Sequence, residues 1–104
     1  MKIPRLIATS LLSAGLMLGG SAVSAGDPER GEKKAGTCAG CHGSGGHSNV
    51  PSMFPTIAGM PEEEIIEKLT AYREGDLQND QMSPQASGLS DQDIRDLAAY
   101  FTQQ

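Results

Sequence analysis

The chain has 104 residues, a formal net charge of −5, two cysteines, two tyrosines, two phenylalanines and no tryptophan. A chain of this length forms one small domain, and so few aromatic side chains build only a small core, so a disulfide, metal or cofactor is expected to add stability. The excess of acidic residues argues against a nucleic-acid-binding protein, which needs a basic surface.

The first 25 residues have the composition of a secretory signal peptide. Lys2 and Arg5 give a positive start, residues 6–18 are mostly apolar, and Val23-Ser24-Ala25 fits a small-residue cleavage site. The apolar run is shorter than the roughly 20 residues that span a bilayer. We therefore expect export to the periplasm, cleavage after about Ala25, and a single domain at residues 26–104 with no membrane span. Cleavage removes two basic residues and no acidic one, which leaves six basic and thirteen acidic residues and a net charge of −7.

The domain begins with a predicted helix that leads into a cysteine motif. Asp27-Pro28-Glu29 combines an N-cap residue, a proline at the first helical position and an acid in the first turn, which predicts a helix to about Gly36. The next segment, Cys38-Ala39-Gly40-Cys41-His42, is the attachment signature of a c-type haem. Side chains three residues apart share one face of a helical turn, so both sulfurs can reach one porphyrin. The motif therefore predicts one covalent haem c, attached through Cys38 and Cys41, with His42 as an axial ligand of the iron.

Other uses of the two cysteines fit this sequence less well. A redox dithiol is expected after a strand in a βαβ context, and no such context is visible. A tetrahedral zinc site needs four ligands, and the chain contains only these Cys and His residues: Cys38, Cys41, His42 and His47. Adjacent Cys41 and His42 are poorly placed to bind the same ion. A structural disulfide and a chance match remain as alternatives.

A loop and a second helix are expected next. Residues 43–55 are dense in glycine and proline, which predicts an irregular loop, here wrapped on one edge of the haem. Pro61 and the acidic residues that follow it predict the start of a helix, and Gly75 predicts its end. The expected apolar stripe of this helix consists of Ile65, Ile66, Leu69 and Tyr72.

The last third of the chain is predicted to hold a polar, irregular segment and a third helix. Residues 76–88 form the irregular segment, which contains Met82-Ser83-Pro84. Ser90-x-x-Asp93 resembles a capping box and predicts the start of the last helix. One buried face of that helix is expected at Ile94, Leu97, Ala98 and Phe101. Strand signals are nearly absent, so the predicted fold is all-α, with three main helices and long loops around one haem.

A second axial ligand is expected on the haem face opposite His42. The candidates are Met53, Met60, Met82, His47 and water. Met82 is favoured because it is well separated from His42 and lies between two helices, so it can cross to the far face. A Met/His pair is the usual arrangement in electron-transfer haems, and the thioether raises the reduction potential.

A larger set of motifs extends over nearly all of residues 26–104. In chain order they are Gly31, Cys38-Ala39-Gly40-Cys41-His42-Gly43, Pro55-Thr56-Ile57-Ala58-Gly59, Leu69-x-x-Tyr72-x-x-Gly75, Met82-Ser83-Pro84, and residues 89–101. In these motifs the chain resembles the class I monohaem cytochromes c of the short bacterial kind. The glycine- and serine-rich loop at residues 43–53 departs from the usual pattern.

The resemblance implies roles for particular residues. Cys38 and Cys41 are expected to form the thioethers, and His42 and Met82 to be the axial ligands. The carbonyl of Pro55 is expected to accept a hydrogen bond from the His42 ring and so fix it. The resemblance also implies that Gly31 and Tyr100 meet where the first and last helices cross.

The function implied is one-electron carriage between redox proteins in the periplasm, without catalysis. Two strong ligands leave the iron no open site for a substrate, and fixed ligands favour fast electron transfer. One alternative is a cytochrome subunit of a larger oxidoreductase, such as a flavocytochrome sulfide dehydrogenase, that takes electrons from a flavoprotein partner. Another is an open-site haem that acts as a peroxidase or binds gases.

Overall fold

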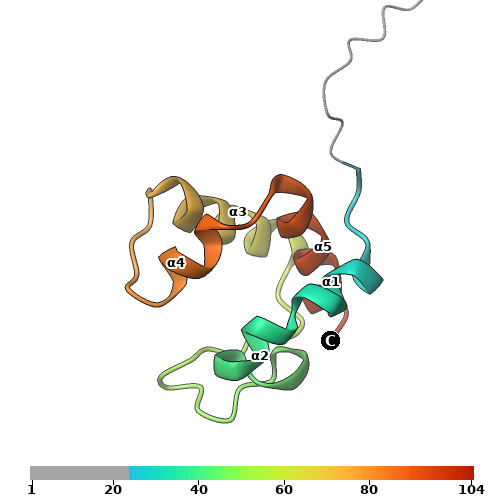
Figure 1. Cartoon of the computed structure of the whole chain (residues 1–104). Coiled ribbons are helices and arrows are strands. Elements are labelled where there is room, and N and C mark those ends of the chain that lie inside the picture. The colour runs from blue at the N-terminus through green and yellow to red at the C-terminus, as the bar shows by residue number, and fades with distance from the viewer. Residues whose placement is uncertain (1–23) are drawn as a thin grey trace, which may run out of the picture.

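The computed structural model describes residues 24–104, and this part of the chain contains helices and loops but no β-strand. The elements in order are α1 (Pro28–Lys34), α2 (Gly36–His42), the short 3₁₀ helix η1 (Ser44–Gly46), α3 (Glu62–Glu74), α4 (Met82–Ser87) and α5 (Asp91–Thr102) (Figure 1). The all-α fold class is confirmed. The expected signal peptide lies outside the described residues except for Ser24 and Ala25. No helix within residues 24–104 has the length and apolar character needed to cross a membrane.

Helices α1 and α2 follow each other almost without a break. Asp27 caps α1, since its Oδ1 accepts hydrogen bonds from the amides of Glu29 and Arg30 at 2.8 and 3.3 Å. Helix α1 ends at Lys34, two residues before the predicted end, and α2 begins after the buried Ala35. The predicted first helix therefore leads directly into the turn that carries the cysteines.

The two longer helices have the ends that local sequence signals predict. Helix α3 follows Pro61 and ends at Gly75, which has φ +87° and ψ 6°, a left-handed conformation that glycine adopts without strain. Helix α5 begins with a capping box, in which Ser90 Oγ accepts from the Asp93 amide and Asp93 Oδ2 accepts from the Ser90 amide, both at 3.0 Å.

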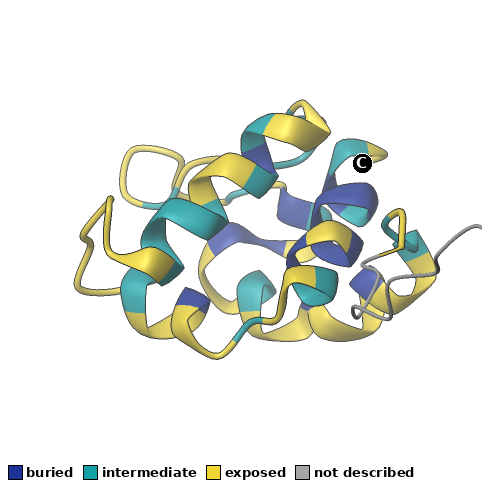
Figure 2. Cartoon of the chain, turned by 90° about the horizontal axis from the view of Figure 1, so that it is seen from above, coloured by how far each residue is buried: buried dark blue, intermediate teal, exposed yellow. Residues whose placement is uncertain are grey.

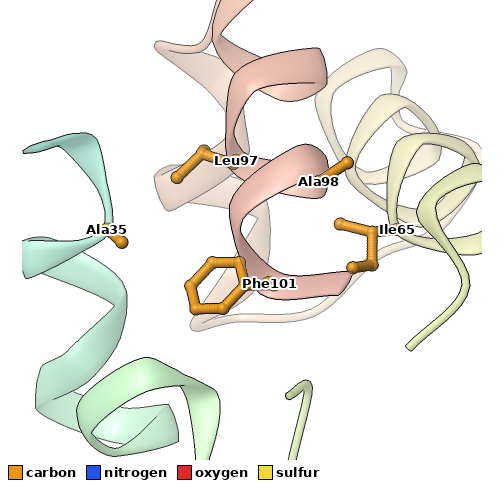
Figure 3. Close-up of a cluster of buried hydrophobic side chains, with 5 residues drawn as sticks. All are labelled: Ala35, Ile65, Leu97, Ala98 and Phe101. Carbon is orange, nitrogen blue, oxygen red and sulfur yellow. The ribbon is translucent and has the colours of Figure 1, made fainter. Parts of the chain in front are cut away.

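Helix α5 lies at the centre of the core, and α1 and α3 both pack against it. The four residues predicted for its buried face are all buried: Ile94, Leu97, Ala98 and Phe101. Three of these form a cluster with Ala35 and Ile65 (Figure 3). Buried positions are few elsewhere, and most of the ribbon outside α5 is exposed or half-buried (Figure 2). The protein side chains alone therefore make a small core.

The crossing of α1 and α5 depends on a glycine and a buried carboxylate. A Cβ at Gly31 would lie 2.0 Å from the carbonyl oxygen of Asp96 and 2.8 Å from Cβ of Tyr100, so only glycine allows this approach. The Asp96 carboxylate is 1% exposed and accepts from Arg30 Nε at 3.0 Å, from the Asp27 amide at 2.9 Å and from Gln92 Nε2 at 3.0 Å. These bonds join the two ends of the domain.

The prediction of an irregular segment at residues 76–88 is wrong in its second half. Residues 82–87 form α4, and Met82 is its first residue rather than part of a loop. The helix forms there because Asn79 Oδ1 accepts hydrogen bonds from the amides of Gln81 and Met82. Pro84 lies in the first turn, where a helix does not need its missing N–H. The loop at residues 43–55 also contains a regular element, the single 3₁₀ turn η1.

Candidate functional site

Helix α2 carries all three reactive residues of the cysteine motif. Cys38 and Cys41 are one helical turn apart, and His42 is the last residue of the helix. The thiols of both cysteines are free, with Cys38 half-buried and Cys41 exposed, while His42 is buried at 8% exposure. Gly43 follows with φ +83°, a left-handed value that turns the chain away from the helix axis. The two sulfurs and the imidazole therefore belong to one short, rigid element.

The ring of His42 is oriented by the backbone of Pro55. Its Nδ1 lies 2.7 Å from the carbonyl oxygen of Pro55. A carbonyl oxygen only accepts, so Nδ1 carries the hydrogen and Nε2 keeps its lone pair. In residues 24–104 no fully buried side-chain nitrogen or oxygen lacks a partner, and Nε2 accepts no hydrogen bond there, so Nε2 is not completely buried. A fixed ring with a free Nε2 is the arrangement of a histidine metal ligand.

The glycine-rich loop after α2 holds Pro55 in place. The carbonyl oxygen of Gly46 accepts from the amides of Ile57 and Ala58 at 2.9 and 3.1 Å, which closes the loop. Gly46 has φ +83°, and a Cβ there would lie 2.9 Å from Phe101 Cδ1. The glycine at position 46 is therefore required by the close packing of its backbone on Phe101 of α5.

The cysteines do not have the features of a redox dithiol or a zinc site. Burial raises the pKa of the Cys38 thiol above its ordinary value, whereas reactive dithiols depend on a lowered pKa. Within residues 24–104, the structure brings together no group of three or more His, Cys, Asp or Glu side chains that could hold a metal ion. His47 is exposed and belongs to no such group.

The candidates for the second axial ligand differ in their surroundings. Met53 is 68% exposed on the loop that precedes Pro55. Met60 is half-buried and packs against the core cluster, which agrees with a packing role. Met82 is half-buried at the start of α4, which packs on α3, whereas α2 packs on α1 and η1. Helices α2 and α4 thus lie on different parts of the fold (Figure 1). The structure brings Pro55 to His42 and keeps Met82 on a separate element.

The residues present fit a covalently attached haem. Two free thiols one turn apart would form the thioether links to the porphyrin. An oriented imidazole with a free Nε2 would bind the iron. Several apolar side chains around the core are covered only in part: Ile57, Met60, Ile66, Leu69 and Leu89. A large flat apolar group is suited to cover such a surface and to enlarge the small core.

Some residues of this region could not be singled out from the sequence. Asn79, which caps α4 next to Met82, was not recognised, because it precedes the helix by three positions. An Asn followed by a proline in the first helical turn is the signal that could have indicated it. The sequence analysis also did not single out Arg73. This side chain donates to the Leu89 carbonyl at 3.3 Å and to Asp91 at 2.7 Å. It therefore joins α3 to the segment that leads from α4 into α5.

Comparisons with known proteins agree with this fold. The family model described as "Cytochrome c" matches residues 28–104. Cytochrome c-554(548) of Halomonas halodenitrificans is 41% identical over 83 residues, which cover 77% of this chain and 99% of that protein. A thiosulfate dehydrogenase electron acceptor of Thiomonas intermedia is 32% identical over 98 residues, which cover 94% of this chain and 43% of that protein.

A solved structure is similar as well. The crystal structure of reduced recombinant cytochrome c4 from Pseudomonas stutzeri has a TM-score of 0.66 and 32% sequence identity, and the match covers 78% of this chain and 51% of that one. The chain thus spans nearly the whole of the Halomonas relative and about half of the other two proteins.

The fold and site are those of a small haem-binding electron-transfer protein. The chain belongs to the cytochrome c family, as a monohaem class I cytochrome of the bacterial type. It is an electron carrier with covalently bound haem c, and electron carriers of this family are generally not enzymes.

Proposed function

We propose that this chain is a periplasmic one-electron carrier in which Cys38 and Cys41 attach the haem and His42 and Met82 are the axial ligands of its iron. The observation that carries the proposal is the 2.7 Å contact between His42 Nδ1 and the Pro55 carbonyl. It gives His42 the tautomer and orientation of an iron ligand, on the same helix as the two thiols.

The chain's own residues suit electron carriage better than catalysis. A haem c bound here supplies a one-electron couple between ferrous and ferric iron. His42 is held rigidly, because both its burial and its bond to Pro55 restrict the ring. Met82 is the first residue of α4, and this helix is anchored to the fold by its packing on α3. Two protein ligands leave no open position for a substrate, and for this reason we propose that the chain is not an enzyme.

The proposed domain begins at Gly26, after a signal peptide at residues 1–25. Gly26 lies against α5 so closely that a Cβ would be 2.1 Å from the carbonyl oxygen of Arg95. The chain is therefore already part of the packed domain at this residue. The acidic net charge of the processed chain suits a periplasmic carrier that meets its redox partners by diffusion.

A second candidate function is that of a dedicated acceptor for one oxidoreductase, including a flavoprotein. The observation that favours it is an exposed apolar pair, Val50 at 48% and Met53 at 68%, on the loop between His42 and Pro55. Residues 43–55 contain no Asp, Glu, Lys or Arg. A neutral, apolar surface beside the proposed haem ligand suits a stable complex with one partner, and one relative is named as the acceptor of a dehydrogenase.

The proposal is tested by intact-mass measurement and absorption spectra of the exported protein. We expect the mass of residues 26–104 plus one haem, which stays with the chain on a denaturing gel stained for haem peroxidase activity. We also expect the spectra of a six-coordinate haem in both oxidation states. Extraction of the haem by acid–acetone would contradict covalent attachment. Stable co-purification with one enzyme would favour the second candidate over the free carrier.

A further inference from the structure

The start of α4 is held by one side chain that lies outside the helix. Asn79 Oδ1 accepts hydrogen bonds from the amides of Gln81 and Met82, each at 2.9 Å. In return, the Asn79 amide donates to Ser83 Oγ at 3.0 Å, and the Ser83 amide donates to the Asn79 carbonyl at 2.9 Å. Four hydrogen bonds thus link one asparagine to Gln81 and to the first turn of the helix.

This cap is needed because α4 cannot hold its first turn by itself. The helix has only six residues, and isolated helices of that length are unstable in water. Its first amides have no partner inside the helix. Gln81, the residue directly before the helix, provides no side-chain hydrogen bond. Asn79 supplies the missing acceptors from two residues further back.

The two ends of α4 are anchored in different ways. Near its C-terminal end, Ala86 is fully buried at 0% exposure, and its carbonyl accepts from the Leu89 amide at 3.0 Å. Leu89 is held in turn by Arg73, which donates to its carbonyl. At the N-terminal end none of these residues is fully buried: Gln81 and Asn79 are exposed, and Met82 and Ser83 are half-buried. The position of Met82 therefore depends on the cap more than on core packing.

We propose that Asn79 is a positioning residue for the Met82 thioether. The inference rests on the proposed function, in which Met82 binds the iron. One of the two amides that donate to Asn79 Oδ1 belongs to Met82 itself, so this bond fixes the backbone from which the thioether side chain extends. Without the cap, the first turn of α4 unwinds part of the time and carries the sulfur away from a fixed iron. Asn79 then controls how completely the sixth position is filled.

The test uses the exported holoprotein with Asn79→Ala, Asn79→Asp and the neighbouring control Gln78→Ala. Asn79→Ala removes both accepted bonds, and we expect the Met82 amide to exchange its hydrogen roughly five- to tenfold faster, as for loss of a helix cap. We also expect a weaker sulfur-to-iron band in the ferric protein and binding of carbon monoxide by a fraction of the ferrous protein. Asn79→Asp keeps an acceptor in the same place and should restore all three properties. Gln78 is exposed and makes no side-chain hydrogen bond within residues 24–104, so its variant should match the parent.

The outcomes separate this inference from the ligand assignment. If Met82→Ala loses the sulfur band while Asn79→Ala keeps the band and still excludes carbon monoxide, Met82 is the ligand but Asn79 does not position it. If Met82→Ala keeps the band, the proposed ligand itself is wrong, and the present inference fails with it. If Asn79→Ala does not accumulate, Asn79→Gln takes its place, because the extra methylene moves the side-chain oxygen away from the backbone amides that it accepts from. The same sulfur-to-iron band and carbon monoxide binding are then measured on that variant.

Discussion

His42 and Met82 are held by contacts of unequal strength. The His42 ring is buried and donates to a carbonyl whose loop is itself closed by two backbone hydrogen bonds. Met82 is half-buried, and its amide is bonded to an exposed asparagine. On the proposed function, one axial ligand is rigid and the other is adjustable. Loss or exchange of an axial ligand should therefore occur first at Met82 rather than at His42.

At the residue scale, Met82→Ala tests the second axial ligand. Thioether ligation raises the reduction potential and blocks added ligands. We expect the variant to lose the weak red sulfur-to-iron band of the ferric protein, to have a lower potential, and to bind carbon monoxide fully when ferrous. Absorption spectra and redox titration measure these properties.

The matched controls are Met53→Leu and Met60→Leu, which nearly conserve volume. Met53 is exposed and Met60 packs against the core, so both variants should keep the spectrum and the potential of the parent. A loss of the sulfur band in Met60→Leu instead would assign the ligand to the segment before α3 and remove Met82 from the site.

At the scale of the elements, the approach of α1 to α5 depends on the absence of a side chain at Gly31. A Cβ there meets the backbone oxygen of Asp96 at 2.0 Å, and a backbone atom cannot move aside as a flexible side chain can. We expect Gly31→Ala to reduce the free energy of unfolding by about 2 kcal/mol, the usual cost of overpacking, in chemical denaturation. Gly36→Ala is the control, because a Cβ there would meet no atom of the rest of the described chain, beyond its own neighbours and helix backbone, within 4 Å. Equal stability of the two variants would show that the helices can separate without cost.

The same crossing predicts a dependence of stability on pH. Burial by itself raises the pKa of Asp96, but hydrogen bonds from Arg30, the Asp27 amide and Gln92 outweigh it and lower the pKa to about 2. A carboxyl with a pKa lowered in the folded state stabilises the fold above the unfolded pKa of about 4, and this stabilisation is lost as the pH falls towards 2. The free energy of unfolding should therefore fall over this range.

Asp96→Asn isolates this contribution from that of other acids. Asp93, whose pKa is lowered by its hydrogen bond from Lys34, acts in the same direction and remains in the variant. We expect the variant to be less stable at pH 6 and to lose less stability than the parent between about pH 4 and pH 2. Denaturant titrations at several pH values measure this, and parallel curves for the two proteins would contradict the role assigned to Asp96.

Local signals account for the elements that the sequence predicted correctly. Asp27, Gly75 and the Ser90–Asp93 pair each mark a helix end through contacts within a few residues. The motif in α2 predicted that the two thiols and the imidazole lie together on one helical turn, because residues at this spacing share one face of a helix. Helix α4 was missed, since its cap lies outside the helix. The partners of Asp96 and Arg73 could not be predicted, because they come from residues that only the tertiary fold brings near.

At the scale of the whole molecule, the described domain has little buried apolar surface of its own. The core cluster contains five buried side chains, two of them alanines, and a surrounding set of apolar residues is covered only in part. Small domains with such cores usually need a disulfide, a metal or a cofactor to stay folded. The free thiols of Cys38 and Cys41 leave the cofactor as the source of that stability.

The chain should therefore not remain folded without its haem. Replacing both Cys38 and Cys41 by alanine removes the proposed covalent attachment and changes few packing contacts, since Cys41 is exposed and Cys38 is half-buried. A group that binds only the folded state stabilises it by its binding free energy, and this contribution is lost in the variant. We expect a largely disordered chain by circular dichroism, whereas the holoprotein should be helical and unfold cooperatively. A cooperative thermal transition in the double variant would show that α1, α3 and α5 are stable by themselves, and the haem would then be needed for electron transfer but not for the fold.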